Sequence, residues 1–326
     1  MKKIFSIVMV SVIILTFFTF AGCKKEEPTL KLGLGVYTSV SATDATDDKA
    51  GQGQATITAA AVLVDDAGKI VKAFVDCADN KVGYTTEGKA VANESFKTKY
   101  EAGADYNMVA YGGAAKEWFE QADAFCALIV GKTAAEVKAL VAENNKGTEE
   151  VINAGCTIYV AEFANAIEKA ISNAKESTAT KEDTLKLGVS TIQTTADATE
   201  DKAGSNKVET TLFAAAVNAE GKVVAASSDC VEVSFGFDPV GTSTFDATKA
   251  VLSKKEKGDN YGMKTYAGSA KEWYEQAAAF DAACVGKTAK EIEGLMGADY
   301  KGNADLQAAG CTIVVSGLVK AASKIG

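Results

Sequence analysis

A short stretch that occurs twice contains the side chains best suited to chemistry. Both copies read Ala-Gly-Cys-Thr-Ile, at residues 154–158 and 309–313. Each puts a glycine, a thiol and a hydroxyl in a row: Gly155, Cys156 and Thr157 in the first copy, Gly310, Cys311 and Thr312 in the second. An apolar pattern with helical spacing follows each copy, so we expect each threonine close to the free N–H groups at the start of a helix. The stretch therefore predicts either a simple helix-start turn or a docking point for an anionic ligand.

Composition excludes several classes of protein. The chain has 34 basic and 43 acidic residues, a net charge of −9 at pH 7, and no histidine. Every basic residue is lysine, so the bidentate arginine forks that bind phosphate and guanine are missing, and we predict no nucleic-acid partner. Without histidine, a Ser-His-Asp or Cys-His enzyme is excluded, and the commonest zinc ligand is missing. The sequence nominates no catalytic and no metal-ligating residue, and it favours a binding protein or electron carrier over a catalyst.

The N-terminus is typical of an exported lipoprotein. A basic start and an apolar run make residues 1–22 a signal peptide. Phe-Ala-Gly-Cys at residues 20–23 resembles the bacterial lipobox, which makes Cys23 the lipidated residue and residues 23–28 a polar tether. We expect the mature protein in the cell envelope, outside the cytoplasm and attached to the membrane through the lipid on Cys23. The alternative is plain secretion.

An internal repeat divides the rest of the chain. The block Lys-Glu-Trp-x-Glu-Gln-Ala at residues 116–122 recurs at 271–277, and Asp76-Cys77 recurs as Asp229-Cys230. A segment rich in lysine, glutamate, serine and threonine separates the copies. The predicted organisation is a first repeat domain at residues 29–172, a linker at 173–183 and a second repeat domain at 184–326, each domain with its own core.

The pattern within one repeat predicts an α+β fold. Residues 55–64 and 69–76 favour two strands joined by a turn at residues 65–68, and residues 82–85 favour a short third strand. A helix is predicted over residues 114–129, and Thr133 and Thr288 each begin a capping box. We expect two similar domains, each a small antiparallel sheet with helices packed on one face.

Six cysteines follow Cys23 and leave two interpretations open. Bridges Cys77–Cys156 and Cys230–Cys311 would be equivalent in the two repeats. The alternative is that these residues and the remaining Cys126 and Cys284 are buried free thiols, because cysteine packs well as a small apolar residue. No Cys-x-x-Cys spacing occurs, which argues against a thioredoxin-like or zinc role.

Each repeat resembles the FMN-binding domain found in the C subunit of sodium-translocating NADH:quinone oxidoreductase and in flavin-carrying surface lipoproteins. The resemblance rests on Gly-Val-Tyr at residues 35–37, on Gly-Lys-Ile at 68–70 and Gly-Lys-Val at 221–223, and on the two Ala-Gly-Cys-Thr turns. The family has Ser-Gly-Ala-Thr at that turn, and an exported flavin transferase esterifies the threonine to FMN in its covalently flavinylated members. The resemblance implies FMN as cofactor and Thr157 and Thr312 as attachment points, with Gly155, Cys156, Gly310 and Cys311 beside it. The Lys-Glu-Trp-x-Glu-Gln-Ala and Gly-Lys-Thr-Ala blocks also resemble blocks in uncharacterised lipoproteins of anaerobic bacteria.

Two classes of function follow. The first is a lipid-anchored flavin carrier that relays electrons to a redox partner outside the cytoplasm. The second is a surface or periplasmic lipoprotein with a binding or structural role and no cofactor.

Overall fold

The computed structural model describes residues 28–93 and 95–326. The predicted signal peptide, Cys23 and nearly all of the predicted tether lie outside the described residues. Within the described part of the chain, no helix is long and apolar enough to cross a membrane.

A three-stranded antiparallel meander forms the centre of each half. In the first half it consists of β1 (Lys31–Thr43), β2 (Gly51–Val64) and β3 (Ile70–Tyr84). Two short edge strands, β4 (Ala90–Val91) and β5 (Lys175–Glu176), extend it to the order β4-β3-β2-β1-β5. Gly68, with φ of 73°, closes the β2–β3 turn, where a residue with a side chain would be strained.

The second half repeats this meander with β6 (Thr184–Ala196), β7 (Gly204–Val217) and β8 (Val223–Phe237), in the order β6-β7-β8. The β2–β3 and β7–β8 pairs each shift register by one residue near the turn, between Leu63 and Val64 and between Ala216 and Val217. The strands of the two meanders are long, at 13 to 15 residues, and antiparallel neighbours run alongside each other for nearly their full length.

Helices cover one face of each sheet. Those of the first half are α1 (Lys99–Ala102), η1 (Gly103–Tyr106), α2 (Trp118–Leu128), α3 (Ala134–Lys138), α4 (Glu149–Asn153) and α5 (Ala161–Ser172). Those of the second half are α6 (Lys254–Lys257), η2 (Gly258–Tyr261), α7 (Met263–Ala267), α8 (Trp273–Cys284), α9 (Ala289–Glu293), α10 (Ala304–Ala308) and α11 (Ser316–Ser323).

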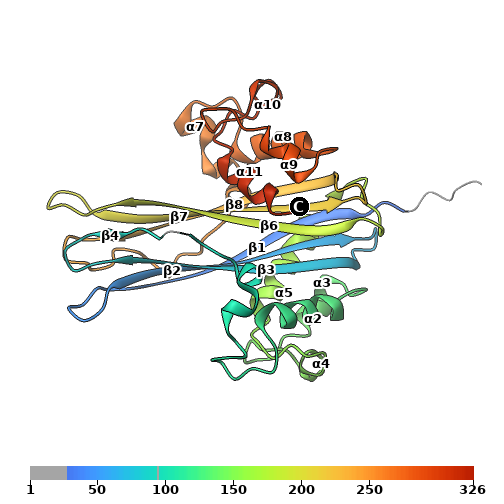
Figure 1. Ribbon diagram of the computed structural model, residues 1–326, viewed down its shortest axis with the longest axis horizontal. Helices are drawn as coiled ribbons and strands as arrows, with labels where there is room; N and C mark the ends of the chain where they lie inside the picture. Colours follow the sequence, from blue (N-terminus) through green and yellow to red (C-terminus); the bar gives the residue numbers. More distant parts are fainter. Residues whose placement is uncertain (1–27, 94) are drawn as a thin grey trace, which may run out of the picture.

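The halves stack as helices, sheet, sheet, helices, with the two sheets facing each other in the middle (Figure 1). The hydrophobic core between the sheets draws residues from both repeats, including Leu34, Ile57, Leu212, Val231 and Phe235. Each sheet also packs against its own helices around a separate outer core. The outer core of the first half contains Trp118, and that of the second half contains Trp273. The predicted α+β class with antiparallel sheets is therefore confirmed.

One expectation about the fold was wrong, and the two halves are joined more closely than a linker alone implies. The predicted short third strand at residues 82–85 is the end of β3, which continues without a break from Ile70 to Tyr84. The segment predicted as a linker is packed rather than free: Lys175–Glu176 pairs with β1, and Ala179 is fully buried between the sheets. The backbone N–H of Leu30 donates to the carbonyl of Ala179 at 2.7 Å, which fixes this segment to the first half. Each half has the core of its own that was expected, and the inner core, which both halves share, was not expected.

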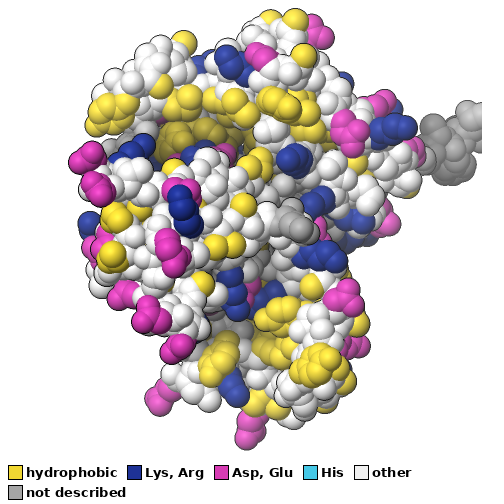
Figure 2. All heavy atoms as spheres, turned by 60° about the vertical axis from the view of Figure 1, so that its left-hand side comes forward, with side chains coloured by type: hydrophobic (Ala, Val, Ile, Leu, Met, Phe, Trp, Pro, Cys, Tyr) yellow, Lys and Arg dark blue, Asp and Glu magenta, His cyan; other side chains and the backbone are white. Residues whose placement is uncertain are grey.

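The end of the molecule where the β1–β2 and β6–β7 hairpins lie shows a hollow between the upper helical layer and its sheet, and apolar side chains line it (Figure 2). Apolar side chains also gather on the outside of both helical layers. Among exposed aromatic residues, Tyr111 and Tyr266 stand out at 88% and 86% exposure, and they occupy equivalent positions in the two repeats.

Candidate functional site

The repeated Ala-Gly-Cys-Thr stretch ends a helix instead of starting one. Ala154 is the C-cap of α4, and Gly155 follows it in a left-handed conformation, with φ of 98°. The N–H groups of Gly155 and Cys156 donate back to Ile152 and Val151 at 3.0 and 3.1 Å, which is the usual closure of a helix C-terminus by glycine. The next long helix, α5, begins only at Ala161. The expected helix-start turn was therefore wrong, and the nearby helix end carries partial negative charge, not positive charge.

Lysine side chains lie over the two turn glycines. A side chain added at Gly155 would collide with the ammonium of Lys116, and one added at Gly310 would collide with that of Lys271. The ammonium of Lys271 also donates to the carbonyl of Ala309 at 3.4 Å. A cation at this position complements the partial negative charge of the helix end, so glycine serves both the backbone conformation and the approach of the lysine.

A buried glutamine ties each turn to the long helix of the same half. The side-chain oxygen of Gln121 accepts hydrogen bonds from the backbone N–H of Thr157 at 2.8 Å and from its hydroxyl at 3.0 Å. Gln276 accepts the same two bonds from Thr312 at the same distances. Both glutamines also donate to the carbonyl of the lysine that begins their block, Lys116 or Lys271.

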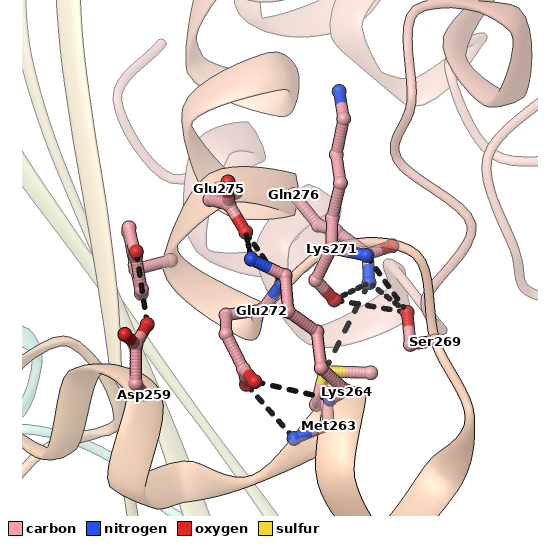
Figure 3. Close-up of polar contacts among 9 residues, drawn as sticks. Asp259, Met263, Lys264, Ser269, Lys271, Glu272, Glu275 and Gln276 are labelled. Carbon is pink, nitrogen blue, oxygen red and sulfur yellow. Dashed lines mark hydrogen bonds and ion pairs between the residues drawn. The ribbon is translucent and has the colours of Figure 1, made fainter.

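The glutamate of the repeated block organises the loop in front of the same helix. Glu272 is the N-cap of α8 and accepts hydrogen bonds from the backbone N–H groups of Met263 and Lys264 at 2.8 and 3.0 Å, and Gln276 holds Ser269 one turn further on (Figure 3). Glu117 does the same for Met108 and Val109 in the first half. The Lys-Glu-Trp-x-Glu-Gln block and the Ala-Gly-Cys-Thr turn are thus two parts of one folded unit, which explains why both recur.

The side chains nominated by the sequence differ in accessibility. Thr157 and Thr312 are exposed, whereas Cys156 and Cys311 are fully buried. Burial raises the pKa of both thiols to about 11, so they stay protonated and unreactive at neutral pH. All six cysteines in the described part of the chain are free, so neither proposed bridge forms. The two turns lie in opposite outer layers and do not combine into one site (Figure 1).

A non-covalent phosphate cradle does not fit these turns. The N–H groups of Gly310, Cys311 and Thr312 donate to Gln307, Leu306 and Gln276, and the first turn has the matching three bonds. No N–H group of those three residues is left to bind a phosphate, and the helix end disfavours an anion. A covalent ester to an exposed threonine hydroxyl requires only access, which both Thr157 and Thr312 have.

A second candidate site is a cleft between the halves. It has a volume of about 1150 Å³ and lies between β1, the segment that follows α5, and the β8, α6 and α8 elements of the second half. Its wall is largely aliphatic, with Leu32, Leu34, Val224 and Val285 among the lining residues, and its polar lining includes Lys255 and Asp281. A concave, mostly apolar site with a few polar groups is the usual form of a small-molecule site.

The equivalent space in the first half is largely filled. Phe74, Tyr100 and Phe119 pack there as an aromatic cluster, with ring centroids 4.8 and 6.0 Å apart. Only a hollow of about 330 Å³ remains, lined in part by Cys126. The second half has smaller or polar residues at the same repeat positions: Ser227 for Phe74, Lys255 for Tyr100, Tyr274 for Phe119 and Asp281 for Cys126. These side-chain differences leave more space beside α8 than beside α2.

Asp281 is the most unusual group in the cleft. It is 8% exposed; its Oδ2 accepts from the backbone N–H of Ser228 at 3.1 Å and lies 3.7 Å from the Lys255 ammonium. Lys255 in turn donates to the Ser227 hydroxyl at 3.2 Å. Asp281 Oδ1 and the Ser228 hydroxyl have no hydrogen-bond partner among the described residues. Both of these atoms are shielded from solvent, whereas the Asp281 side chain itself lines the cleft beside Lys255, which makes this charged pair the candidate for ligand contact.

Sequence reasoning missed this site. The repeat was recognised by what the two copies share, whereas the cleft arises where they differ. The replacement of Cys126 by Asp281 within matching helices was the available signal, because an acid rarely replaces a buried thiol without a partner.

Comparisons with protein-family models, with curated proteins and with solved structures found no match to this chain. Within the described residues, no three histidine, cysteine, aspartate or glutamate side chains are grouped so as to hold a metal ion.

Proposed function

We propose that this chain is an exported, lipid-anchored binding protein that holds a small organic molecule in the cleft between its two halves. The observation that carries the proposal is the asymmetry of the repeat. The matching positions of the repeat hold an aromatic cluster in one half and border a cleft of about 1150 Å³ in the other. The lipid anchor at Cys23 and the location in the cell envelope rest on the N-terminal sequence.

The energetic cost of the polar groups supports a binding role. Leaving a buried donor or acceptor without a partner costs about 1–3 kcal/mol. The second half has two such atoms, on Asp281 and Ser228, at positions where the first half has the apolar Cys126 and Val75. The apolar pair is sufficient for packing at these positions in the first half. The polar pair in the second half therefore points to a function rather than to a packing role.

A ligand screen tests the proposal. The protein is expressed from residue 24 on, which retains every described element, and its melting temperature is measured against a library of small metabolites. Ala282 lines the cleft, and Ala127 is its exposed counterpart in the first half. We expect at least one compound to raise the melting temperature of the wild type and of Ala127→Trp but not of Ala282→Trp. Equal responses in both variants would place binding outside the cleft and overturn the proposal.

The exposure of Thr157 and Thr312 favours a second candidate, a flavin carrier of the covalent kind. An exported flavin transferase would esterify one FMN to each hydroxyl, and the outer layers would then present two flavins to a redox partner. Intact-mass spectrometry of protein made in cells with such a transferase decides between the candidates. Two FMN additions, each lost in Thr157→Ala or Thr312→Ala, would establish the carrier. An unmodified mass would exclude the covalent flavin carrier, so that the binding protein remains as the candidate function.

A further inference from the structure

We infer that the cleft binds a zwitterion, a molecule with an amino and a carboxylate group on one carbon and an apolar body. The inference rests on the proposed binding function and specifies its ligand. It is carried by the juxtaposition of Asp281 and Lys255 in the wall of a cleft that also has an aliphatic part, formed by residues such as Leu34.

Asp281 suits an ammonium group. An ionised carboxylate only accepts hydrogen bonds, and here one oxygen is occupied by the Ser228 N–H while the other has no partner among the described residues. Oδ1 is shielded from solvent, so a ligand in the cleft would bring its N–H donors to Oδ2, from which the Lys255 ammonium is still 3.7 Å away. Charge-assisted bonds of this kind are stronger than neutral ones, especially where little water competes.

Lys255 suits a carboxylate on the same ligand. Its ammonium has three N–H donors, of which one bonds to Ser227, and it approaches Asp281 only to 3.7 Å, longer than a normal hydrogen bond. An α-amino acid separates its ammonium from its carboxylate by one carbon atom. Two opposite charges this close together in the wall therefore match both ends of such a headgroup.

The other acidic groups in the cleft have lysine partners of their own. Glu275 pairs with Lys264, Glu256 with Lys169 and Glu176 with Lys31. These three lysines do not line the cleft, whereas Lys255 does. Asp281 and Lys255 are thus the lining pair of opposite charge within ion-pair distance, and the aliphatic residues around them would contact the apolar body of the ligand.

The first half supplies an internal comparison. Cys126 and Tyr100 occupy the matching positions, so a charged headgroup would find neither of its partners there. One zwitterion per chain is therefore expected, although the fold is duplicated.

Calorimetric titration with L-phenylalanine and two analogues tests the inference. Phenethylamine lacks the carboxylate and 3-phenylpropanoate lacks the amine, but both keep the apolar body. We expect L-phenylalanine to bind with one site per chain and each analogue to bind about 10- to 100-fold more weakly, as the loss of one charged hydrogen-bonding group requires. Asp281→Asn and Lys255→Met should each weaken L-phenylalanine by a similar factor. The controls Asp123→Asn in the first half and Lys257→Met on the same helix as Lys255 should not.

Different results separate this inference from the proposed function. If phenethylamine binds as tightly as L-phenylalanine and Lys255→Met has no effect, the ligand is a simple amine and the inference fails. If no amino acid binds but the library yields a compound that Ala282→Trp blocks, the inference fails while the binding function stands. If neither amino acids nor library compounds respond to Ala282→Trp, both fail.

Discussion

A buried aspartate occupies the same place on the third strand of each half. Asp76 accepts hydrogen bonds from the backbone N–H groups of Cys77 and Tyr100, at 2.7 and 3.1 Å. Asp229 accepts the matching bonds from Cys230 and Lys255. Each carboxylate thereby holds the first turn of a short helix, α1 or α6, against the sheet. In the second half that turn positions Lys255 at the cleft.

Burial raises the pKa of Asp76 to about 6 and also raises that of Asp229. Because the folded protein holds these protons more tightly than the unfolded chain, each aspartate stabilises the fold below about pH 4, near its unfolded pKa. For Asp76 this contribution is lost as the pH rises through about 6, which is the opposite of a salt-bridged carboxylate.

The Asp76→Asn variant should show this dependence. Asparagine keeps the shape and one acceptor but does not ionise. The stability of the variant relative to wild type should therefore increase between pH 4 and pH 7, by on the order of 2–3 kcal/mol. Urea unfolding at both pH values measures it, and Asp229→Asn should change in the same direction. Parallel pH curves for Asp76→Asn and wild type would show that folding does not shift the pKa of this aspartate.

At the level of elements, the unit formed by the block and the turn is the most constrained part of each half. Gln276 is 1% exposed and bonds through both its oxygen and its nitrogen, joining α8, the loop before it and the turn after α10. The Lys-Glu-Trp-x-Glu-Gln block thus has a structural role. The periodicity of apolar residues in the sequence could not reveal this role, because the contacts that define it join segments that are far apart in the chain.

Replacing Gln276 by leucine should destabilise the protein by about 1–3 kcal/mol, because the Thr312 N–H would lose its acceptor in a partly buried place. Thr312→Val is the matched control, since it removes only the hydroxyl and leaves the N–H bond to Gln276 in place. Its cost should be smaller than that of Gln276→Leu. Denaturant unfolding measures both. Wild-type stability in Gln276→Leu would show that water replaces the glutamine without loss.

Much of the secondary structure was predictable, and the failures have identifiable physical causes. Residues 55–64 were expected to form a strand, and β2 contains them. β1 was not predicted, because its Leu-Gly-Leu-Gly alternation lacks outward-facing side chains: Gly33 and Gly35 lie directly against the backbone of α5. The turn at Gly155 was assigned to the wrong end of a helix, since α4 is only five residues long and gives no periodic pattern.

At the scale of the molecule, both faces of the central strands are buried. In β2, Ile57 and Leu63 face the inner core while Val62 and Val64 face the helices. A continuous apolar run rather than strict alternation is what such a strand requires. The run at residues 59–64 therefore contained the information that a second layer covers the sheet, although it could not show that the layer is the other half of the same chain.

Polar and aromatic contacts also cross between the sheets. The amide of Asn80 in β3 donates to the hydroxyl of Thr210 in β7 at 2.9 Å, and both residues are buried. Tyr84 stacks on Phe237 with ring centroids 4.6 Å apart. Together with the shared core, these contacts predict that neither half is stable without the other, despite the duplication.

The two tryptophans make this prediction measurable, since Trp118 reports on the first half and Trp273 on the second. Both are buried against their own helical layer. In the single-tryptophan variants Trp118→Phe and Trp273→Phe, fluorescence follows one half at a time during urea unfolding. If the inner core couples the halves, Leu212→Ala in β7 should lower both midpoints together, at a cost of about 2–5 kcal/mol.

Val319→Ala is the control, because it changes the outer core of the second half and leaves the inner core intact. It too should lower both midpoints if the whole chain unfolds in a single transition. A midpoint for the Trp118 signal that stays fixed while the Trp273 signal moves would show that the halves unfold separately and that the inner core is only a loose contact.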